Sequence, residues 1–256
     1  MPNRPPEGLL FVATGERFLA EAIEAARASR PHLAGRPVAL CTDDPAAARA
    51  AAAFDQVLPH PDPRRSYRDK IAPLLQLPFR RTLFLDTDAR LIAPVQGLFN
   101  LLEHHQLAAA HAPVRRPDGW WDAAAPASFP ELNSGVLLLR RGLRQQALIR
   151  RWLHRYDQID QAWDQASLRS AVWQGLARGL RLAVLPPEAN LRTTKPWVVG
   201  KGLAVQVVHG RVPDSEWPAL EAYLNGDLQR FRSSAEWLQR HPDSALRPQV
   251  APEPAG

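Results

Sequence analysis

Compact apolar runs alternate with segments of helical periodicity along most of this chain. The runs at residues 8–14, 36–42, 56–58 and 83–85 predict buried strands, because a strand covered on both faces reads as a continuous apolar stretch. Residues 16–29, which follow the first run, place their apolar side chains on one face of a helix. Strands that alternate with helices predict an α/β fold with a mostly parallel, doubly wound central sheet flanked by helices.

The same alternation continues toward the C-terminus. The further expected helices are residues 46–53, 67–77, 95–105, 143–156, 164–173, 217–224 and 227–240. The further expected strands are residues 107–111, 132–139, 182–185 and 203–208. Asp43 and Asp44 precede the first of these helices and are expected to cap it. The Pro, Ala and polar residues at 242–256 predict a disordered tail, which leaves residues 1–241 as one folded domain.

The irregular segment at residues 112–131 is long for a connection inside a compact domain. It holds two adjacent tryptophans, Trp120 and Trp121. Aromatic side chains in a loop suit a platform on which a sugar ring stacks, and they equally suit buried packing anchors. The sequence leaves both roles open.

Composition restricts the class of protein and its expected location. The chain has 256 residues, of which 45% are apolar and 23% charged, as in ordinary globular domains. Its single cysteine, Cys41, excludes an intramolecular disulfide and a cysteine-rich zinc site. Because the sequence shows no signal peptide and no run of about 18 apolar residues, a cytoplasmic protein is expected.

The net charge of +6 comes almost entirely from arginine, since Lys70, Lys195 and Lys201 are the only lysines. A basic surface favours a phosphorylated ligand, a nucleic acid or an anionic membrane surface as partner. No block of five like charges and no nucleic-acid motif occurs in the sequence. We therefore expect no nucleic-acid partner, whereas peripheral membrane contact through the basic surface stays open.

Two carboxylates, Asp86 and Asp88, follow the apolar run at residues 83–85. Residues i and i+2 of an extended chain point the same way, so both side chains can present oxygens to one point. Mg²⁺ and Mn²⁺ prefer such ligands, and open α/β sheets bind ligands beyond the carboxyl ends of their strands. The pair indicates a divalent-metal site, although capping of a turn or helix also accounts for it.

Six short motifs, this pair among them, occur in one order along the chain. They are Lys70, Leu85-Asp86-Thr87-Asp88, Asn133-Ser134-Gly135-Val136, Asp164-Gln165, Leu185-Pro186 with Asn190, and Val207-Val208-His209. Their order and spacing resemble those of the GT-A-fold retaining glycosyltransferases of the glycogenin and lipooligosaccharide galactosyltransferase group. The resemblance runs from about residue 9 to about residue 211. It implies the GT-A fold of nucleotide-diphospho-sugar transferases.

The resemblance implies a role for each chemical motif. Asp86, Asp88 and His209 would hold Mn²⁺ or Mg²⁺ on the diphosphate of a nucleotide sugar, for which a UDP-sugar is expected. Asp164 and Gln165 would be catalytic, with Asp164 on the sugar hydroxyls and Gln165 beside the anomeric carbon. The expected donor-binding residues are Thr14, Phe18, Lys70, Asp86, Thr87, Asp88, Asn133, Ser134 and Arg211. The class of acceptor, whether saccharide, glycolipid or protein, stays open.

Two positions depart from the pattern of that group. Phe18 stands where many members have a tyrosine, and no lysine follows His209 closely, so Arg211 is expected to contact phosphate. Because glutamine is a poor nucleophile, the resemblance implies transfer with retention of configuration but no covalent intermediate through Gln165. The alternatives are a catalytically silent nucleotide-sugar-binding protein and, with less support, a sugar-nucleotide pyrophosphorylase, because no glycine-rich Arg-Lys loop follows the first strand.

Overall fold

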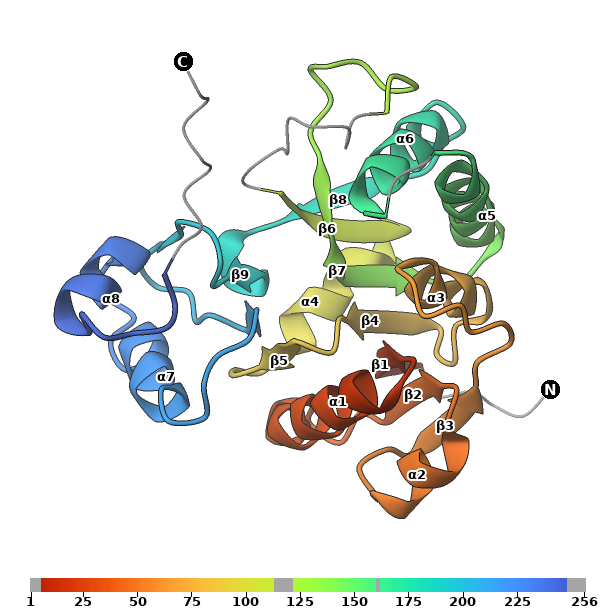
Figure 1. Ribbon diagram of the computed structural model, residues 1–256. Helices are drawn as coiled ribbons and strands as arrows, with labels where there is room; N and C mark the ends of the chain where they lie inside the picture. The colour runs from red at the N-terminus through yellow and green to blue at the C-terminus, as the bar shows by residue number, and fades with distance from the viewer. Residues whose placement is uncertain (1–5, 113–121, 160–161, 248–256) are drawn as a thin grey trace.

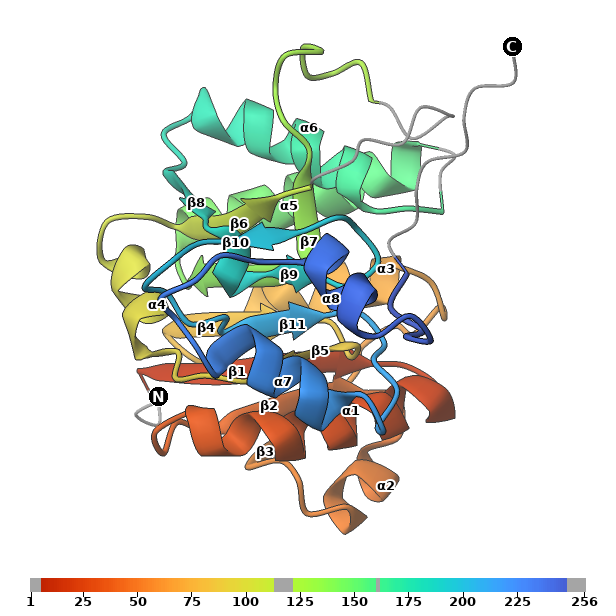
Figure 2. The ribbon, with the colours of Figure 1, turned by 90° about the vertical axis from the view of Figure 1, so that its left-hand side faces the viewer.

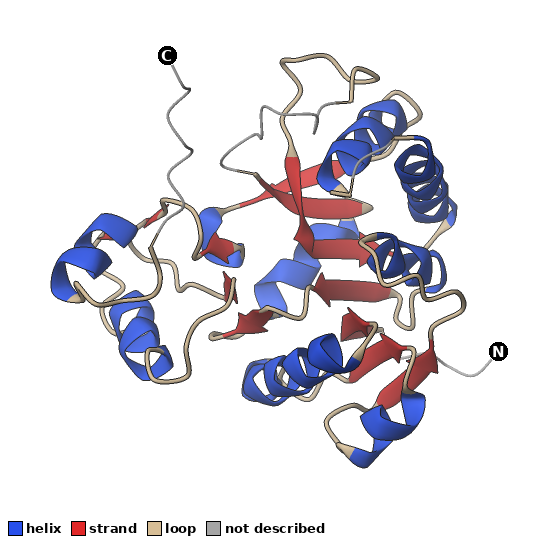
Figure 3. Ribbon diagram, viewed as in Figure 1, coloured by secondary structure: helices blue, strands red, loops and turns tan. Residues whose placement is uncertain are grey.

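The computed structural model describes residues 6–112, 122–159 and 162–247. Within these residues, seven strands form a central sheet that has helices on both faces (Figures 1 and 3). In spatial order the strands are β3 (Gln56–Pro59), β2 (Val38–Thr42), β1 (Glu7–Ala13), β4 (Arg81–Leu85), β7 (Leu132–Arg140), β6 (Leu107–His111) and β8 (Leu182–Leu185). The predicted α/β architecture with a mostly parallel central sheet is therefore confirmed.

One strand of the central sheet, β7, runs against its two neighbours. It pairs antiparallel with β4 and with β6, whereas the other neighbouring pairs are parallel. In the ladder between β4 and β7, Leu85 at the end of β4 lies opposite Val136 in the middle of β7, so residues 132–135 extend beyond the end of β4. An antiparallel strand begins at the edge where its neighbour ends, so polar residues that open β7 lie at the carboxyl end of β4.

Side chains alternate between two apolar layers along the buried strands. In β1, Leu9 and Phe11 belong to one layer, and Leu10 and Val12 belong to the other. The helices that complete these layers are α1 (Glu16–Ser29) and α4 (Gln96–Asn100) on the first side and α3 (Arg68–Ile71), α5 (Leu143–Gln158) and α6 (Gln165–Leu176) on the second. Burial on both faces explains why the sequences of these strands are continuous apolar runs. Each fully buried apolar side chain contributes about 2 kcal/mol to the free energy of folding.

A smaller region beside the central sheet is built mostly from the C-terminal part of the chain (Figures 1 and 2). Its strands are β5 (Ala89–Leu91), β11 (Val207–His209) and β9 (Leu191–Arg192) in one sheet and β10 (Val198–Val199) with β12 (Arg232–Ser233) in another. Its helices are α7 (Trp217–Asn225) and α8 (Ser234–Arg240). A third apolar cluster, which includes Trp197, Val208, Leu220 and Trp237, packs these elements together. None of the helices that the structure describes is long and apolar enough to span a membrane.

Several predicted elements are shorter than their sequence patterns indicate. The prediction of a helix at 227–240 is wrong over its first half. Within this range only α8 is helical, and Arg232 is extended in β12. The buried guanidinium of Arg232 donates to the carbonyl oxygens of Leu224 and Leu203 over 2.9 and 2.8 Å. These hydrogen bonds to other segments favour an extended conformation at Arg232. The periodicity of the local sequence carries no information about such tertiary contacts.

Three further expectations are corrected in detail. The expected helices at 67–77 and 95–105 each become a short α-helix followed by a 3₁₀ helix, and the expected strand at 203–208 reduces to β11. Asp44 caps α2 (Pro45–Ala50) as predicted, by accepting from the backbone N–H of Ala47 over 3.0 Å. Asp43 instead accepts from the backbone N–H of Gly15 over 2.9 Å. Trp120 and Trp121 lie outside the described residues.

The segment that follows α8, which the sequence assigns to a disordered tail, begins with a docked stretch. The Ser244 hydroxyl donates to Glu216 over 2.5 Å and accepts from the indole N–H of Trp237 over 3.0 Å. Leu246 is 8% exposed and belongs to the third apolar cluster. Residues 242–247 therefore pack on α7 and α8, and residues 248–256 lie outside the description.

Two truncations separate the docked stretch from the rest of the tail. A chain that ends at Arg247 is expected to keep the full melting temperature, given the Pro- and Ala-rich composition beyond it. A chain that ends at Arg240 loses the burial of Leu246 and the bonds of Ser244, so it is expected to lose about 2–4 kcal/mol of unfolding free energy. Thermal denaturation of both truncations measures this, and equal stability of the two would contradict a docked stretch.

Candidate functional site

The end of β4 and the start of β7 form one wall of the candidate site. The backbone N–H of Asp86 donates to the carbonyl oxygen of Gly135 over 2.8 Å, so the two chains touch where the ladder ends. Asn133 and Ser134, which precede that glycine, are buried at the same edge. The antiparallel direction of β7 thus brings an amide, a hydroxyl and a carboxylate together at the carboxyl end of the sheet.

Three candidate metal ligands converge at this edge. Asp86 follows β4, Asp88 directly precedes β5, and His209 is the last residue of β11, where it pairs with Ala89 of β5. Their ligand atoms lie within 4.8 Å of one another, and Nε2 of His209 is 3.4 Å from Asp88 Oδ1 and 4.0 Å from Asp86 Oδ2. Two carboxylates and an imidazole suit Mn²⁺ or Mg²⁺ and leave coordination positions for other oxygen ligands.

Gly135 forms the floor of this ligand group. A Cβ atom at this position would lie 2.6 Å from Oδ2 of Asp86 and 2.8 Å from Nε2 of His209, well inside van der Waals contact. A side chain here would therefore displace the candidate ligands. The sequence indicates a close approach at this glycine, and the structure places that approach against the three candidate metal ligands.

The electrostatic environment keeps Asp88 ionised. Burial alone would raise the pKa of this carboxyl, but His209, Arg211 and Arg192 outweigh burial and hold the pKa well below its usual range. Arg211 contributes with a guanidinium nitrogen 3.6 Å from Asp88 Oδ2. An ionised carboxylate is the form that binds a divalent cation.

Lys70 lies in the centre of the site and pairs with two carboxylates. Its Nζ donates to Oδ2 of Asp86 over 3.1 Å and to the hydroxyl of Ser134 over 3.0 Å, and it lies 3.3 Å from Oδ2 of Asp164. Burial alone would lower the pKa of Lys70, but Asp164 and Asp86 raise it above its ordinary value, so the amine stays charged. Burial raises the pKa of Asp164, and Lys70 opposes that shift.

A chain of buried amide side chains connects the histidine with the start of α6. His209 Nδ1 lies 3.0 Å from Oδ1 of Asn190, and Nδ2 of Asn190 donates to Oδ1 of Asn133 over 2.8 Å. Nδ2 of Asn133 donates to Oε1 of Gln165, and Nε2 of Gln165 donates to Oε1 of Glu131, both over 2.7 Å. All five residues are at most 5% exposed, so little of this chain of side chains is open to solvent.

Glu21 of α1 holds two other residues of the candidate site, Arg211 and Thr87, by hydrogen bonds. It accepts two hydrogen bonds from the guanidinium of Arg211, over 3.0 and 3.1 Å, and one from the hydroxyl of Thr87 over 3.0 Å. Burial alone would raise the pKa of Glu21, but the bonds from Arg211 and Thr87 lower it below its ordinary value. Arg211 is therefore held in place by a carboxylate that the sequence reasoning did not single out.

Comparisons with solved structures agree with this arrangement of strands. A galactosyltransferase LgtC in complex with donor and acceptor sugar analogues superposes with a TM-score of 0.56 at 14% identity, over 85% of this chain and 96% of that chain. An active-site Gln→Glu variant of LgtC gives 0.55 at 16% identity, over 80% and 88%. Mouse xyloside xylosyltransferase 1 gives 0.50 at 15% identity, over 80% and 98%.

The chain has the GT-A fold. This result confirms the fold that the resemblance implies. The identities of 14–16% are too low to transfer an activity, so the likeness establishes architecture and nothing finer. No protein-family model and no curated protein sequence matches the chain.

The edge of the GT-A sheet opens into a cavity of about 870 Å³. The sequence-predicted residues that line it are Thr14, Phe18, Lys70, Asp86, Thr87, Asp88, Asn133, Ser134, Gln165, His209 and Arg211. Thr14 uses its hydroxyl to donate to Asp69 over 2.7 Å, whereas the ring of Phe18 is 43% exposed. Asp164 is the predicted site residue outside the lining: it is fully buried beneath Lys70.

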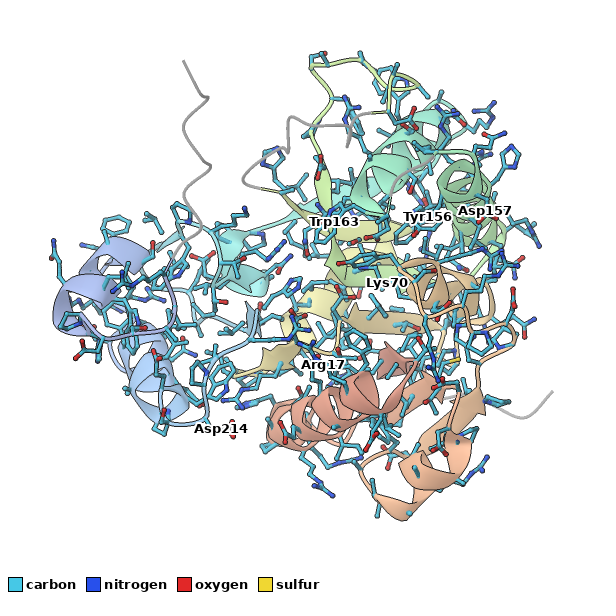
Figure 4. The ribbon with its side chains drawn as sticks, viewed as in Figure 1. Arg17, Lys70, Tyr156, Asp157, Trp163 and Asp214 are labelled. Atoms are coloured by element: carbon cyan, nitrogen blue, oxygen red, sulfur yellow. The ribbon has the colours of Figure 1, made fainter. Side chains whose placement is uncertain are left out.

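Several lining residues were missed by sequence reasoning. Arg192 of β9 lies opposite His209 in the ladder with β11, and its buried Nε has no hydrogen-bond partner among the described residues. Tyr67 and Trp163 also line the cavity, with ring centroids 4.9 Å apart. Figure 4 shows Lys70 and Trp163 near the middle of the molecule, between α1 and α6. Tyr67 stands three residues before Lys70, so helical spacing could have indicated it, whereas nothing local distinguishes Arg192.

Proposed function

We propose that this protein is a glycosyltransferase that moves a sugar from a nucleotide-diphosphate donor, a UDP-sugar, to an acceptor with retention of configuration. The observation that carries the proposal is the group of Asp86, Asp88 and His209, joined by Lys70, which lines a large cavity in a GT-A fold. A cavity of about 870 Å³ lies within the range of small-molecule sites. Clusters of ionisable groups in such a cavity mark a functional-site candidate.

Cationic side chains around the ligand group suit a diphosphate. Mn²⁺ or Mg²⁺, held by Asp86, Asp88 and His209, would supply Lewis-acid neutralisation of the charge that develops on a leaving nucleotide. Lys70 adds a fixed positive charge at the same place. Arg192 also lines the cavity, and guanidinium groups pair well with phosphate oxygens.

The polar residues at the start of α6 favour reaction on one face of the sugar. Gln165 lines the cavity, and its amide is fixed by Asn133 on one side and Glu131 on the other. A fixed amide presents a dipole in constant orientation at the position we assign to the anomeric carbon. Asp122, which lies in the chain ahead of β7, is buried and paired with Arg155, so it does not serve as an acceptor-side base.

The aromatic pair of Tyr67 and Trp163 at the cavity wall favours a saccharide as the acceptor. Tyr67 is 40% exposed and packs against Trp163 in an edge-to-face arrangement on the Lys70 side of the cavity. Aromatic faces suit the apolar faces of sugar rings. The exposed ring of Phe18, at the opposite wall, is assigned to the base of the nucleotide.

The proposal is tested with nucleotide sugars as donors. Turnover of one donor, with dependence on Mn²⁺ or Mg²⁺, is expected, and proton NMR of the product should show an α-linkage from an α-linked donor. Gln165→Ala is expected to lower kcat by about 100-fold while donor affinity changes little, because its role lies at the reacting carbon. A β-linked product would contradict retention and the role of Gln165, and metal-dependent binding without turnover would favour the silent binding protein instead.

A further inference from the structure

The orientation of the side-chain amides in this buried chain is fixed by a backbone N–H group, which can donate a hydrogen bond but cannot accept one. The backbone N–H of Gly135 donates to Oδ1 of Asn133 over 3.1 Å. A backbone N–H can only donate, so the oxygen of this side chain must face it. Nδ2 of Asn133 then faces Oε1 of Gln165, which in turn leaves the Gln165 amino group facing the carboxylate of Glu131.

The same constraint passes from Asn133 to the histidine. Because Oδ1 of Asn133 is an acceptor, Asn190 turns its amino group toward it, over 2.8 Å, and its oxygen toward Nδ1 of His209, over 3.0 Å. An amide oxygen can only accept, so Nδ1 must carry the hydrogen. The opposite nitrogen, Nε2, is the one that faces Asp86 and Asp88.

We infer that Asn190 is a positioning residue that keeps the hydrogen of His209 on Nδ1 and so directs the Nε2 lone pair to a divalent cation. The inference rests on the metal site of the proposed function. Asn190 and His209 are each 5% exposed, so water cannot replace the bond if the amide is removed. The nitrogen that binds a metal is set by the hydrogen bond of the other nitrogen.

Reversing any one amide of this chain would leave buried groups of equal polarity in contact. Such a mismatch costs about 1–3 kcal/mol for each unsatisfied group. The Gly135 N–H in the middle of the chain and the Glu131 carboxylate at its end both require the observed direction. The metal-ligand histidine and the amide assigned to the reacting carbon are therefore oriented by one shared residue, Asn133.

The test compares Asn190→Leu with Asn190→Asp. Leucine removes the acceptor, so Mn²⁺ affinity, measured from the electron paramagnetic resonance of free Mn²⁺ without any nucleotide, is expected to fall 10- to 100-fold. Aspartate still accepts from Nδ1, so it should retain most of the Mn²⁺ affinity, although its second oxygen faces Oδ1 of Asn133 and is expected to lower the melting temperature. A merely structural role predicts that both variants lose melting temperature and affinity together, and that result would overturn the inference.

A second measurement reads the histidine directly. In protein labelled with ¹⁵N-histidine at about pH 9, with and without Mg²⁺, Nδ1 of His209 is expected to resonate as a nitrogen that carries hydrogen. Asn190→Leu should move the hydrogen to Nε2, and His209→Gln assigns the signal. An unprotonated Nδ1 in the unaltered protein would overturn the inference even if no variant folds. Failure of the metal proposal alone would appear as a protonated Nδ1 with no response to Mg²⁺ or Mn²⁺.

Discussion

Asp88→Asn is expected to abolish metal-dependent binding of a nucleotide diphosphate and to lower turnover about a thousandfold. The amide keeps the shape of the side chain but removes the charge that a divalent ion requires. Loss of Lewis-acid stabilisation is worth several kcal/mol, and each 1.4 kcal/mol changes a rate about tenfold. Isothermal titration of UDP with and without Mn²⁺ measures the loss of binding.

Asp214→Asn is the matched control for this variant. Asp214 is exposed at the periphery of the molecule, and the same atoms change without any contact to the ligand group (Figure 4). Binding and turnover in the control should equal those of the unaltered protein. Undiminished Mn²⁺-dependent titration in Asp88→Asn would show that this carboxylate does not hold the metal.

Lys70→Met is expected to destabilise the protein by about 3–5 kcal/mol, because it removes the countercharge of a buried carboxylate. Asp164 is fully buried and lies 3.3 Å from Nζ of Lys70. Methionine fills a similar volume, so the loss reports charge and not a cavity. Urea denaturation of the variant at pH 7 measures the change in unfolding free energy.

The pH dependence and a double variant identify the responsible group. Without Lys70, burial keeps the pKa of Asp164 above its ordinary value, so the folded state of the variant binds a proton more tightly than the unfolded state. The stability deficit of Lys70→Met should therefore be smallest at acid pH, grow as the pH rises from the ordinary carboxyl pKa to the raised pKa, and stay constant above it. Lys70→Met with Asp164→Asn should recover most of the loss at pH 7, and a double variant as unstable as the single one would contradict this account.

The central fold was predictable because its signals are local. Residues 83–85 read as a buried strand, and Asp86 and Asp88 directly after it mark the carboxyl edge of the sheet. In the structure both carboxylates lie beside His209, which is far along the chain. The order of the motifs in the sequence predicts this grouping. Continuous apolar runs do not encode strand direction, so the antiparallel course of β7, which brings Asn133 to the site, needed the structure.

The remaining site residues depend on contacts between distant segments. Asn190 has no feature in the sequence that reveals its bond to His209, and Arg192 becomes a site residue only because β9 pairs with β11. Asp164 is a polar residue ahead of a helix, for which a cap is the ordinary expectation. Its burial against Lys70 follows from the packing of α3 and α6 on one face of the sheet, and no local pattern reports that packing.

The ligand group spans two sheets, and this has a consequence for the energetics of unfolding. Asp86 follows β4 of the seven-stranded sheet, whereas Asp88 directly precedes β5 and His209 ends β11, both in the three-stranded sheet. An ion bound by all three would join the two sheets noncovalently, in addition to the chain connections between them. By mass action, an ion at 100 times its dissociation constant adds about 2.7 kcal/mol to the folded state. The divalent ion would then hold the two sheets together. After its removal by a chelator, the amide hydrogens of β5 and β11 would exchange with solvent faster than those of β1 and β4.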